Sequence, residues 1–122
     1  YSDDAKNIQG KWVAVKAEIG GQPLPKDTVG KMGVFLDGTN YEAKTPNGLD
    51  KGTYKLVSDG KLKAVDMAGG AESPFKEKAI LGVYELKGDT LTVCYGFEGK
   101  RPTELKSTEA NRFVVVVYKR TK

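Results

Sequence analysis

Apolar and polar residues alternate in short runs along most of this chain. Between residues 11 and 19 the alternation has a period of two, which places Trp12 and Lys16 on one side of an extended segment and Val13 and Ala17 on the other. This period is typical of a half-buried β-strand rather than a helix. The pattern therefore predicts that the ordered chain opens with a strand, and that this strand carries the only tryptophan.

The most hydrophobic run lies at the opposite end of the chain. Residues 113–118 contain Phe113, four consecutive valines and Tyr118. β-branched and aromatic side chains fit a pleated surface, so the run predicts a closing strand over residues 112–120. In a sheet that closes on itself, this strand would lie beside the first one, with Trp12 at the seam.

Turn signals divide the middle of the chain at regular intervals. Asp37-Gly38 and Pro46-Asn47-Gly48 supply the positive φ angles of tight turns, and Lys87-Gly88-Asp89 marks the clearest hairpin. Eight strands are predicted, at residues 11–19, 32–36, 40–45, 52–57, 62–67, 79–86, 90–97 and 112–120. Sequential strands with short connections indicate an all-β fold, and we expect a single domain over residues 1–122, an eight-stranded antiparallel up-and-down barrel. The interior of such a barrel just holds side chains or one small ligand.

The remaining segments are predicted to be connections. Residues 4–9 suit one turn of helix with Ile8 as its apolar contact. Residues 21–31 contain two prolines, which lack the N–H that a strand ladder needs. We expect no strand there, and only a short helical turn at Asp27–Gly30. Polar loops are expected at residues 68–78 and 98–111.

The composition excludes several kinds of chemistry. The chain has no histidine and one cysteine, which removes Ser-His-Asp and Cys-His catalysis, histidine-based metal sites and an internal disulfide. Its net charge of +4, from 20 basic and 16 acidic residues, is small for a protein that binds nucleic acid. The longest apolar run is far shorter than the roughly 20 residues of a membrane-spanning helix. We expect no enzyme activity, no cofactor or metal, no nucleic-acid partner and no membrane span.

Three residues have both a functional and a structural interpretation. Trp12 is either a stacking floor for a ligand or a plug at the closed end of the barrel. Cys94 is either a thiol activated by a nearby cation, such as Arg101, or a small buried apolar group. Arg101 follows a glycine-rich stretch and is either an anion-binding group at the barrel mouth or a member of a structural ion pair.

The charged residues of the strands give weaker signals. Asp66, Glu85 and Glu104 are the candidate acids, since two paired carboxylates, one of them desolvated, can do acid–base chemistry. Asp66 shares the parity of Leu62 and Ala64, so we expect its carboxyl to point inward. No spacing in the sequence brings these acids together, and the alternative for each is a surface charge or a structural ion pair. Four lysines lie close together in the middle of the chain: Lys51, Lys55, Lys61 and Lys63. They form either a positively charged patch that binds an acidic polymer or anionic lipid, or an ordinary solvated outer face.

Two features at the ends of the chain resemble the calycin superfamily, which contains the lipocalins and fatty-acid-binding proteins. These are Gly10-Lys11-Trp12 on the first strand and Tyr118-Lys119-Arg120 on the last, where a basic residue would cover the tryptophan ring. More closely, the chain is similar to a lipocalin-like domain family found chiefly in planctomycete bacteria. The matching segments include Gly20-Gly21-Gln22-Pro23-Leu24-Pro25, Ala64-Val65-Asp66, Gly82-Val83-Tyr84-Glu85-Leu86, Cys94-Tyr95 and Arg101-Pro102-Thr103-Glu104.

This resemblance implies a small barrel in an exported or lipid-anchored protein, hence an extracytoplasmic location, although no signal peptide is visible in the sequence. One departure concerns the Arg-x-Tyr pair with which fatty-acid-binding proteins hold a carboxylate. Here Val116 stands two residues before Tyr118, so the arginine is missing. The resemblance therefore predicts the fold better than it predicts a ligand.

Together these patterns predict a non-enzymatic binding module, monomeric or weakly oligomeric, for a small apolar or amphiphilic ligand. The residues expected to line its site are Trp12, Tyr84, Tyr95, Arg101, Tyr118 and Arg120. The alternative is a solidly packed barrel that serves as a structural or protein-interaction domain and takes no ligand.

Overall fold

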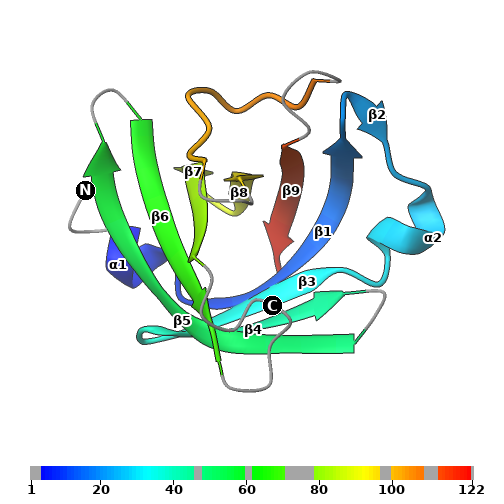
Figure 1. Cartoon of the computed structure of the whole chain (residues 1–122). Coiled ribbons are helices and arrows are strands. Elements are labelled where there is room, and N and C mark those ends of the chain that lie inside the picture. The colour runs from blue at the N-terminus through cyan, green and yellow to red at the C-terminus, as the bar shows by residue number, and fades with distance from the viewer. Residues whose placement is uncertain are drawn as a thin grey trace.

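The chain folds into a closed eight-stranded antiparallel β-barrel with almost no helix (Figure 1). The computed structural model describes residues 4–45, 48–59, 62–70, 79–96, 100–108 and 113–121. Its elements are α1 (Asp4–Asn7), β1 (Gly10–Ile19), β2 (Gln22–Pro23), α2 (Lys26–Val29), β3 (Gly33–Asp37), β4 (Asn40–Thr45), β5 (Gly48–Asp59), β6 (Leu62–Gly69), β7 (Ala79–Lys87), β8 (Thr90–Gly96) and β9 (Val114–Arg120). The predicted turn at residues 46–47, the loop over 71–78 and Lys61 lie outside the described residues.

Ring closure is made by the two ends of the chain. From β3 to β9 each strand pairs antiparallel with the next, and β9 then pairs with β1. Trp12 lies opposite Arg120, and Ile19 lies opposite Val114. Figure 1 shows β1 in blue and β9 in red side by side. The predicted barrel and its seam are therefore confirmed.

Two predicted turns are present where the sequence places them. Asp37 pairs with Asn40 and Lys87 with Thr90, so each hairpin turns through two residues. The first of these two residues is a glycine with positive φ, 64° at Gly38 and 57° at Gly88. A side chain with a Cβ rarely adopts this conformation, which is why the turn signals locate the strand ends well.

One part of the first strand differs from the expected alternation. The pairing with β9 passes from Ala14 to Lys16 while the partner advances by only one residue, so β1 contains a β-bulge at Val15. Trp12 and Ala14 face the interior, and after the bulge Ala17 is buried while Lys16 is exposed. The prediction that Lys16 shares the side of Trp12 along an unbroken strand was therefore wrong.

The connection between β1 and β3 also differs in part from its prediction. The short helical turn is present as α2, whose Val29 is buried in the core. The two-residue strand β2 was not expected, because Pro23 cannot donate to a ladder. Pro23 nevertheless lies opposite Glu18, because β2 is an edge strand and an edge strand tolerates a residue without an N–H. The next residue, Leu24, donates its N–H to the carbonyl of Ala17 at 2.9 Å.

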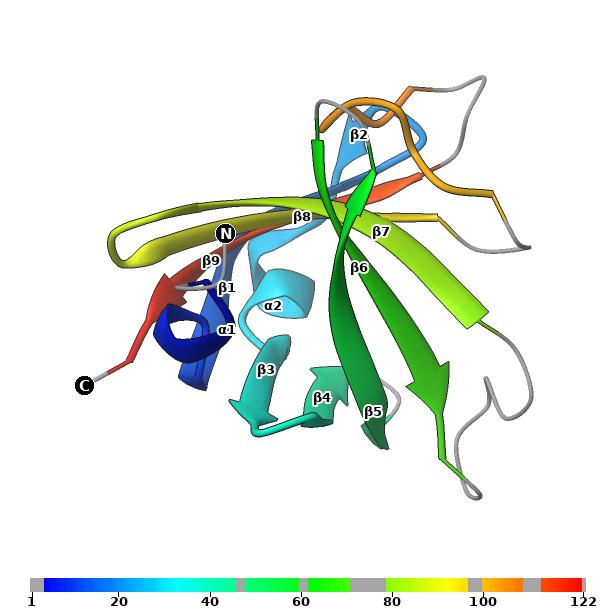
Figure 2. The same ribbon diagram turned by 90° about the vertical axis from the view of Figure 1, so that its left-hand side faces the viewer.

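The barrel has a second, smaller core on its outer face. Inward-facing side chains form the main core, whereas Ala64, Val83, Cys94 and Val115 pack on the outside of β6–β9. Residues 100–108 cover them, as the orange segment above β7 and β8 shows in Figure 1, and Figure 2 shows the same covering segment from the side. Because Ala64 faces outward although fully buried, Asp66 on the same parity also faces outward, and the expected inward orientation of Asp66 was wrong.

Candidate functional site

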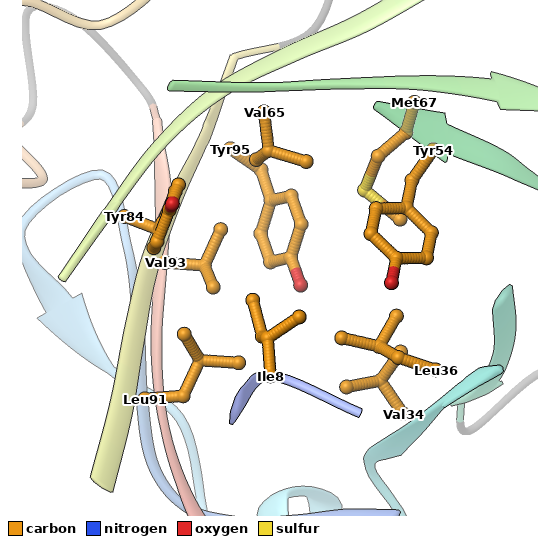
Figure 3. A pocket seen from close by; sticks show the side chains of 10 residues that line it. All are labelled: Ile8, Val34, Leu36, Tyr54, Val65, Met67, Tyr84, Leu91, Val93 and Tyr95. Carbon is orange, nitrogen blue, oxygen red and sulfur yellow. The ribbon is translucent and has the colours of Figure 1, made fainter. Parts of the chain in front are cut away.

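A small apolar cavity lies inside the barrel (Figure 3). Its volume is about 30 Å³, the space of one or two water molecules. Side chains from five strands and from the segment before β1 line it; they are Ile8, Val34, Leu36, Tyr54, Val65, Met67, Tyr84, Leu91, Val93 and Tyr95. Figure 3 shows these side chains converging from all sides. Among the described residues, the side chains that line this cavity leave space for little more than water.

Tyrosine hydroxyls supply the polar atoms next to the cavity. The hydroxyls of Tyr95 and Tyr118 lie 2.8 Å apart in a hydrogen bond. Burial raises the pKa of Tyr118 to about 12 and raises that of Tyr95 well above its usual value. Both phenols are therefore neutral at physiological pH, and one donates to the other.

A third hydroxyl, that of Tyr54, connects the cavity wall to the segment before β1, which we call the chain entry. Tyr54 accepts a hydrogen bond of 2.8 Å from Nε2 of Gln9, and Oε1 of Gln9 accepts one of 2.6 Å from the N–H of Gly38. Gln9 thereby fixes the β3–β4 turn against β5. Sequence reasoning missed Gln9 and Tyr54, because a polar residue before a strand gives no sign of the partner it reaches 45 positions away.

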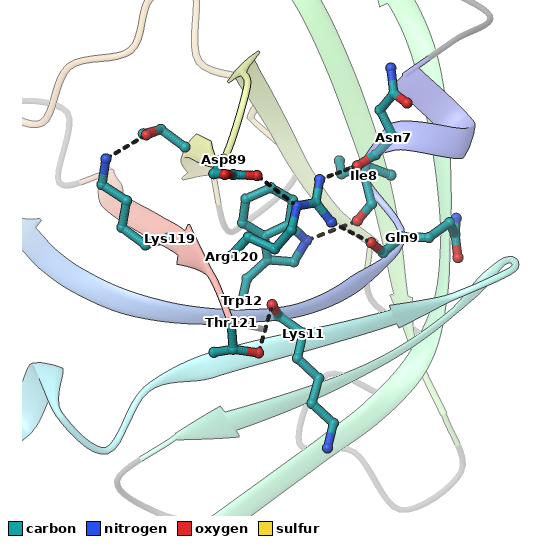
Figure 4. A network of polar contacts seen from close by, with 10 residues as sticks. Asn7, Ile8, Gln9, Lys11, Trp12, Asp89, Lys119, Arg120 and Thr121 are labelled. Atoms are coloured by element: carbon teal, nitrogen blue, oxygen red, sulfur yellow. Dashed lines mark hydrogen bonds and ion pairs between the residues drawn. The ribbon is translucent and has the colours of Figure 1, made fainter.

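One end of the barrel is sealed by Trp12 and Arg120 (Figure 4). The indole is 1% exposed and donates its Nε1–H to the carbonyl of Ile8 at 2.8 Å. The Arg120 guanidinium carbon stands 4.3 Å from the ring centroid, and its Nη1 donates to the carbonyl of Gln9 at 2.7 Å. This confirms the predicted basic cover over the ring, and the indole occupies the plug position rather than the cavity wall.

Two further contacts hold the Arg120 side chain in place. Its Nη2 donates to the carbonyl of Asn7, and its Nε lies 3.2 Å from Oδ1 of Asp89 in the β7–β8 turn. The guanidinium therefore links three segments, the chain entry, β9 and the β7–β8 turn, as the dashed lines in Figure 4 show. Three of its nitrogens thus donate to protein oxygens at the seam.

Arg101 lies away from the cavity, on the outer face of the barrel. Its guanidinium forms an ion pair with Asp66 and donates to the carbonyl of Gly82 at 2.9 Å. The arginine is largely buried, with 19% of its side chain exposed. These contacts correspond to the structural interpretation of Arg101, because they pin the covering segment to β6 and β7.

Of the six residues expected to line a ligand site, the structure brings three together. Tyr84 and Tyr95 lie on the cavity wall, and Tyr118 contacts Tyr95 through its hydroxyl. Trp12 and Arg120 form the end seal, and Arg101 belongs to the outer face.

Cys94 is buried in the outer core beneath residues 100–108. Its side chain has no exposed surface, and its Sγ lies 3.8 Å from the carbonyl oxygen of Lys106. Burial raises the pKa of the Cys94 thiol to about 11, so the reactive thiolate is scarce at neutral pH. This environment corresponds to the structural interpretation of the cysteine.

The acidic and basic residues considered for chemistry lie on the outside. Glu85 pairs with Lys87 at 3.7 Å on an exposed surface, and Lys51 pairs with Glu42 at 3.4 Å. Within the described ranges, no three acidic or cysteine side chains gather into a group that could hold a metal ion. Nor does this part of the chain contain a helix long and apolar enough to cross a membrane.

The fold defines a small closed β-barrel domain. No protein-family model matches the chain, and no curated protein matches it. A solved structure does: a DUF4847 family protein from Bacteroides vulgatus ATCC 8482 superposes with a TM-score of 0.56 at 13% identity, over 98% of this chain and 97% of the other. At this identity the likeness shows the fold alone. The kinship with lipocalin-like domains and with planctomycete proteins stays a prediction.

Proposed function

We propose that this domain is a non-enzymatic interaction module, a packed barrel that binds its partner through the outer surface. The observation that supports this proposal is a difference in volume. The interior cavity measures about 30 Å³, whereas a groove on the outer face of the sheet measures about 300 Å³. Sites for small molecules usually offer 300–1,000 Å³. The space for a partner is therefore outside the barrel.

The absence of histidine from the whole sequence supports the non-enzymatic part of the proposal. The acids that were candidates for acid–base work point away from the interior, and two of them, Asp66 and Glu85, are engaged by basic neighbours. A general acid or base needs a desolvated position beside a substrate, which neither carboxyl has here.

A titration with decanoate tests the packed interior. Methyl signals of Met67 and Val93, which line the cavity, report any molecule that enters it. We expect no saturable shift of these signals up to millimolar decanoate. Saturable shifts that disappear when Val93→Phe fills the cavity would overturn the proposal.

A second candidate function is the binding of a small apolar or amphiphilic molecule inside the barrel. It is favoured by the chemistry of the cavity wall, which is apolar apart from tyrosine hydroxyls, and by Met67, whose flexible side chain can change its rotamer. The same decanoate titration decides between the two candidates, since a ligand of that length needs several interior side chains to move.

Location and assembly belong to this proposal as well. We infer an extracytoplasmic, monomeric or weakly oligomeric protein without a nucleic-acid partner, on the basis of the lipocalin-like resemblance and the modest net charge of +4. Cell fractionation, sedimentation and an electrophoretic mobility shift at low salt each test one part.

A further inference from the structure

The groove on the outer face of the barrel crosses strands β1, β3, β4 and β5. We call it the outer groove and define it by Lys11, Val13, Gly33, Phe35, Lys44 and Leu49. Each of these residues alternates with an inward-facing neighbour, such as Trp12, Val34 or Asp50, and therefore points away from the core.

Strand register places the groove residues in a row. Val13 lies opposite Gly33, Gly33 opposite Lys44, and Lys44 opposite Leu49. With neighbouring strands about 4.8 Å apart, Val13 and Leu49 stand roughly 14 Å apart at the backbone, on the two sides of the groove.

The floor of the outer groove has no side chain at its centre. A Cβ on Gly33 would lie 2.9 Å from the carbonyl oxygen of Trp12, a distance that side chains do not adopt. The close approach of β3 to the Trp12 carbonyl on β1 therefore requires glycine at position 33. The missing side chain leaves a hollow beside the Phe35 ring.

The walls of the hollow are apolar and in contact with water. Val13 is 44% exposed and Leu49 is 60% exposed. Such an open groove covers only part of a small molecule, whereas ligand pockets bury most of theirs. A partner larger than the groove, which places one side chain in it, fits this geometry better.

The charges at the rim are positive. Lys11 and Lys44 form no ion pair within the part of the chain that the structure describes, whereas Glu42, the acidic residue of this rim, is paired with Lys51 at 3.4 Å. Lys11 and Lys44 lie on either side of β3 and two residues apart along it, which separates their backbones by roughly 12 Å. Complementary charge on a partner is therefore negative, at two points on either side of the hollow.

An extended peptide matches this spacing. Residues i−2, i and i+2 of a strand point to one side, and the outer two are roughly 13 Å apart. We propose that the outer groove binds an extended segment of a partner protein in which one large apolar residue is flanked, two positions away on each side, by acidic residues. The apolar side chain lies over Gly33, and the two carboxylates pair with Lys11 and Lys44. This inference rests on the proposed function and names the partner's chemistry.

The probe for the test is the capped pentapeptide Glu-Ser-Phe-Ser-Glu, titrated into the ¹⁵N-labelled protein. We expect saturable shifts of the amides of Val13, Gly33 and Lys44, weakened by added salt. The peptide Ser-Glu-Phe-Glu-Ser has the same composition but turns its carboxylates away from the side of the phenylalanine, so it should bind more weakly. Equal binding of the two peptides would contradict the proposed spacing.

Variants locate the interaction. Lys44→Glu and Leu49→Asn, both on the exposed rim, should each weaken binding about 3- to 10-fold. Lys100→Glu changes the same charge on the covering segment, and Val15→Asn makes a comparable apolar-to-polar change on β1 outside the groove. Both controls should bind like the wild type, and the amide spectrum of each variant reports whether it is folded.

The other outcomes separate this inference from the proposed function. Saturable shifts at a different part of the outer surface, or no binding of Glu-Ser-Phe-Ser-Glu up to 10-fold excess over the protein at millimolar concentration, overturn the inference and leave the packed-barrel proposal intact. A dimer in sedimentation that Leu49→Asn dissociates assigns the groove to a second copy of this chain, which also overturns the inference. Interior binding of decanoate overturns the proposed function itself.

Discussion

Replacing Arg120 with alanine removes the contacts that close the barrel at its seam. The guanidinium covers the Trp12 ring at 4.3 Å and donates to the carbonyls of Gln9 and Asn7. A partly buried cation–π contact contributes about 1 kcal/mol, and each charge-assisted hydrogen bond to a carbonyl contributes about 1 kcal/mol after discounting for solvent. The ion pair with Asp89 adds little, because that carboxylate is 73% exposed.

Arg120→Ala should therefore lower the free energy of unfolding by about 3 kcal/mol, or the melting temperature by roughly 10 °C. Urea unfolding measured by tryptophan fluorescence and by circular dichroism gives this value. Arg120→Lys keeps a cation near the ring but loses the fork of donors, so its loss should be intermediate. Lys119→Ala is the control, since Lys119 is exposed and its ammonium donates a side-chain hydrogen bond to the hydroxyl of Thr90.

A loss below 0.5 kcal/mol for Arg120→Ala, no larger than that of Lys119→Ala, would refute this reasoning. It would mean that β1 and β9 are held together by their backbone hydrogen bonds and by apolar contacts alone, and that the contact of the guanidinium with the indole contributes little to stability.

Three further predictions concern buried groups. Val93→Ile adds one methylene at the cavity wall and should stabilise the fold by up to about 0.8 kcal/mol in urea unfolding; a loss above 1 kcal/mol would mean that no space exists there. Cys94 should resist a thiol reagent such as dithionitrobenzoate at pH 8 until the chain unfolds, because its thiol is covered and its pKa is raised to about 11; rapid labelling of the native protein would contradict this burial. Stability should fall as pH rises from about 9 to 12, since the unfolded chain releases the protons of Cys94, Tyr95 and Tyr118 at lower pH than the folded chain does; urea midpoints that stay constant over this range would contradict the raised pKa values.

Local sequence signals predicted most of the fold correctly, because they act through local geometry. Glycine at the Gly38 and Gly88 turns fixes where strands end, and alternation fixes which segments are strands. The closing contact between Trp12 and Arg120 was also predicted, although from the resemblance to calycins and not from the pattern itself.

The errors arise where one part of the fold depends on a distant part. The bulge at Val15 follows from the register with β9, which the sequence of β1 alone does not contain. Asp66 was expected inside because Ala64 reads as a core residue, and Ala64 is indeed buried. It is buried, however, under residues 100–108 on the outer face, so burial did not mean the barrel interior.

The candidate site was less predictable than the fold. Tyr84 and Tyr95 were expected on the cavity wall and lie there, but the size of the cavity depends on how ten side chains pack together. Adding or removing one methylene at a few of these positions is enough to close the cavity of about 30 Å³ or to enlarge it into a ligand-sized pocket. The outer groove was missed because it results from a glycine, Gly33, whose role is visible only in the packing against Trp12.

The proposed function depends most on an interior that is already filled by its own side chains. A crystal structure of the protein grown in the presence of millimolar decanoate tests this claim directly. We predict an interior whose space between Met67 and Tyr95 holds no more than one or two water molecules, as the cavity of about 30 Å³ requires. Continuous density for an aliphatic chain among these side chains would contradict the packed barrel and would support the binding of an apolar or amphiphilic ligand inside it.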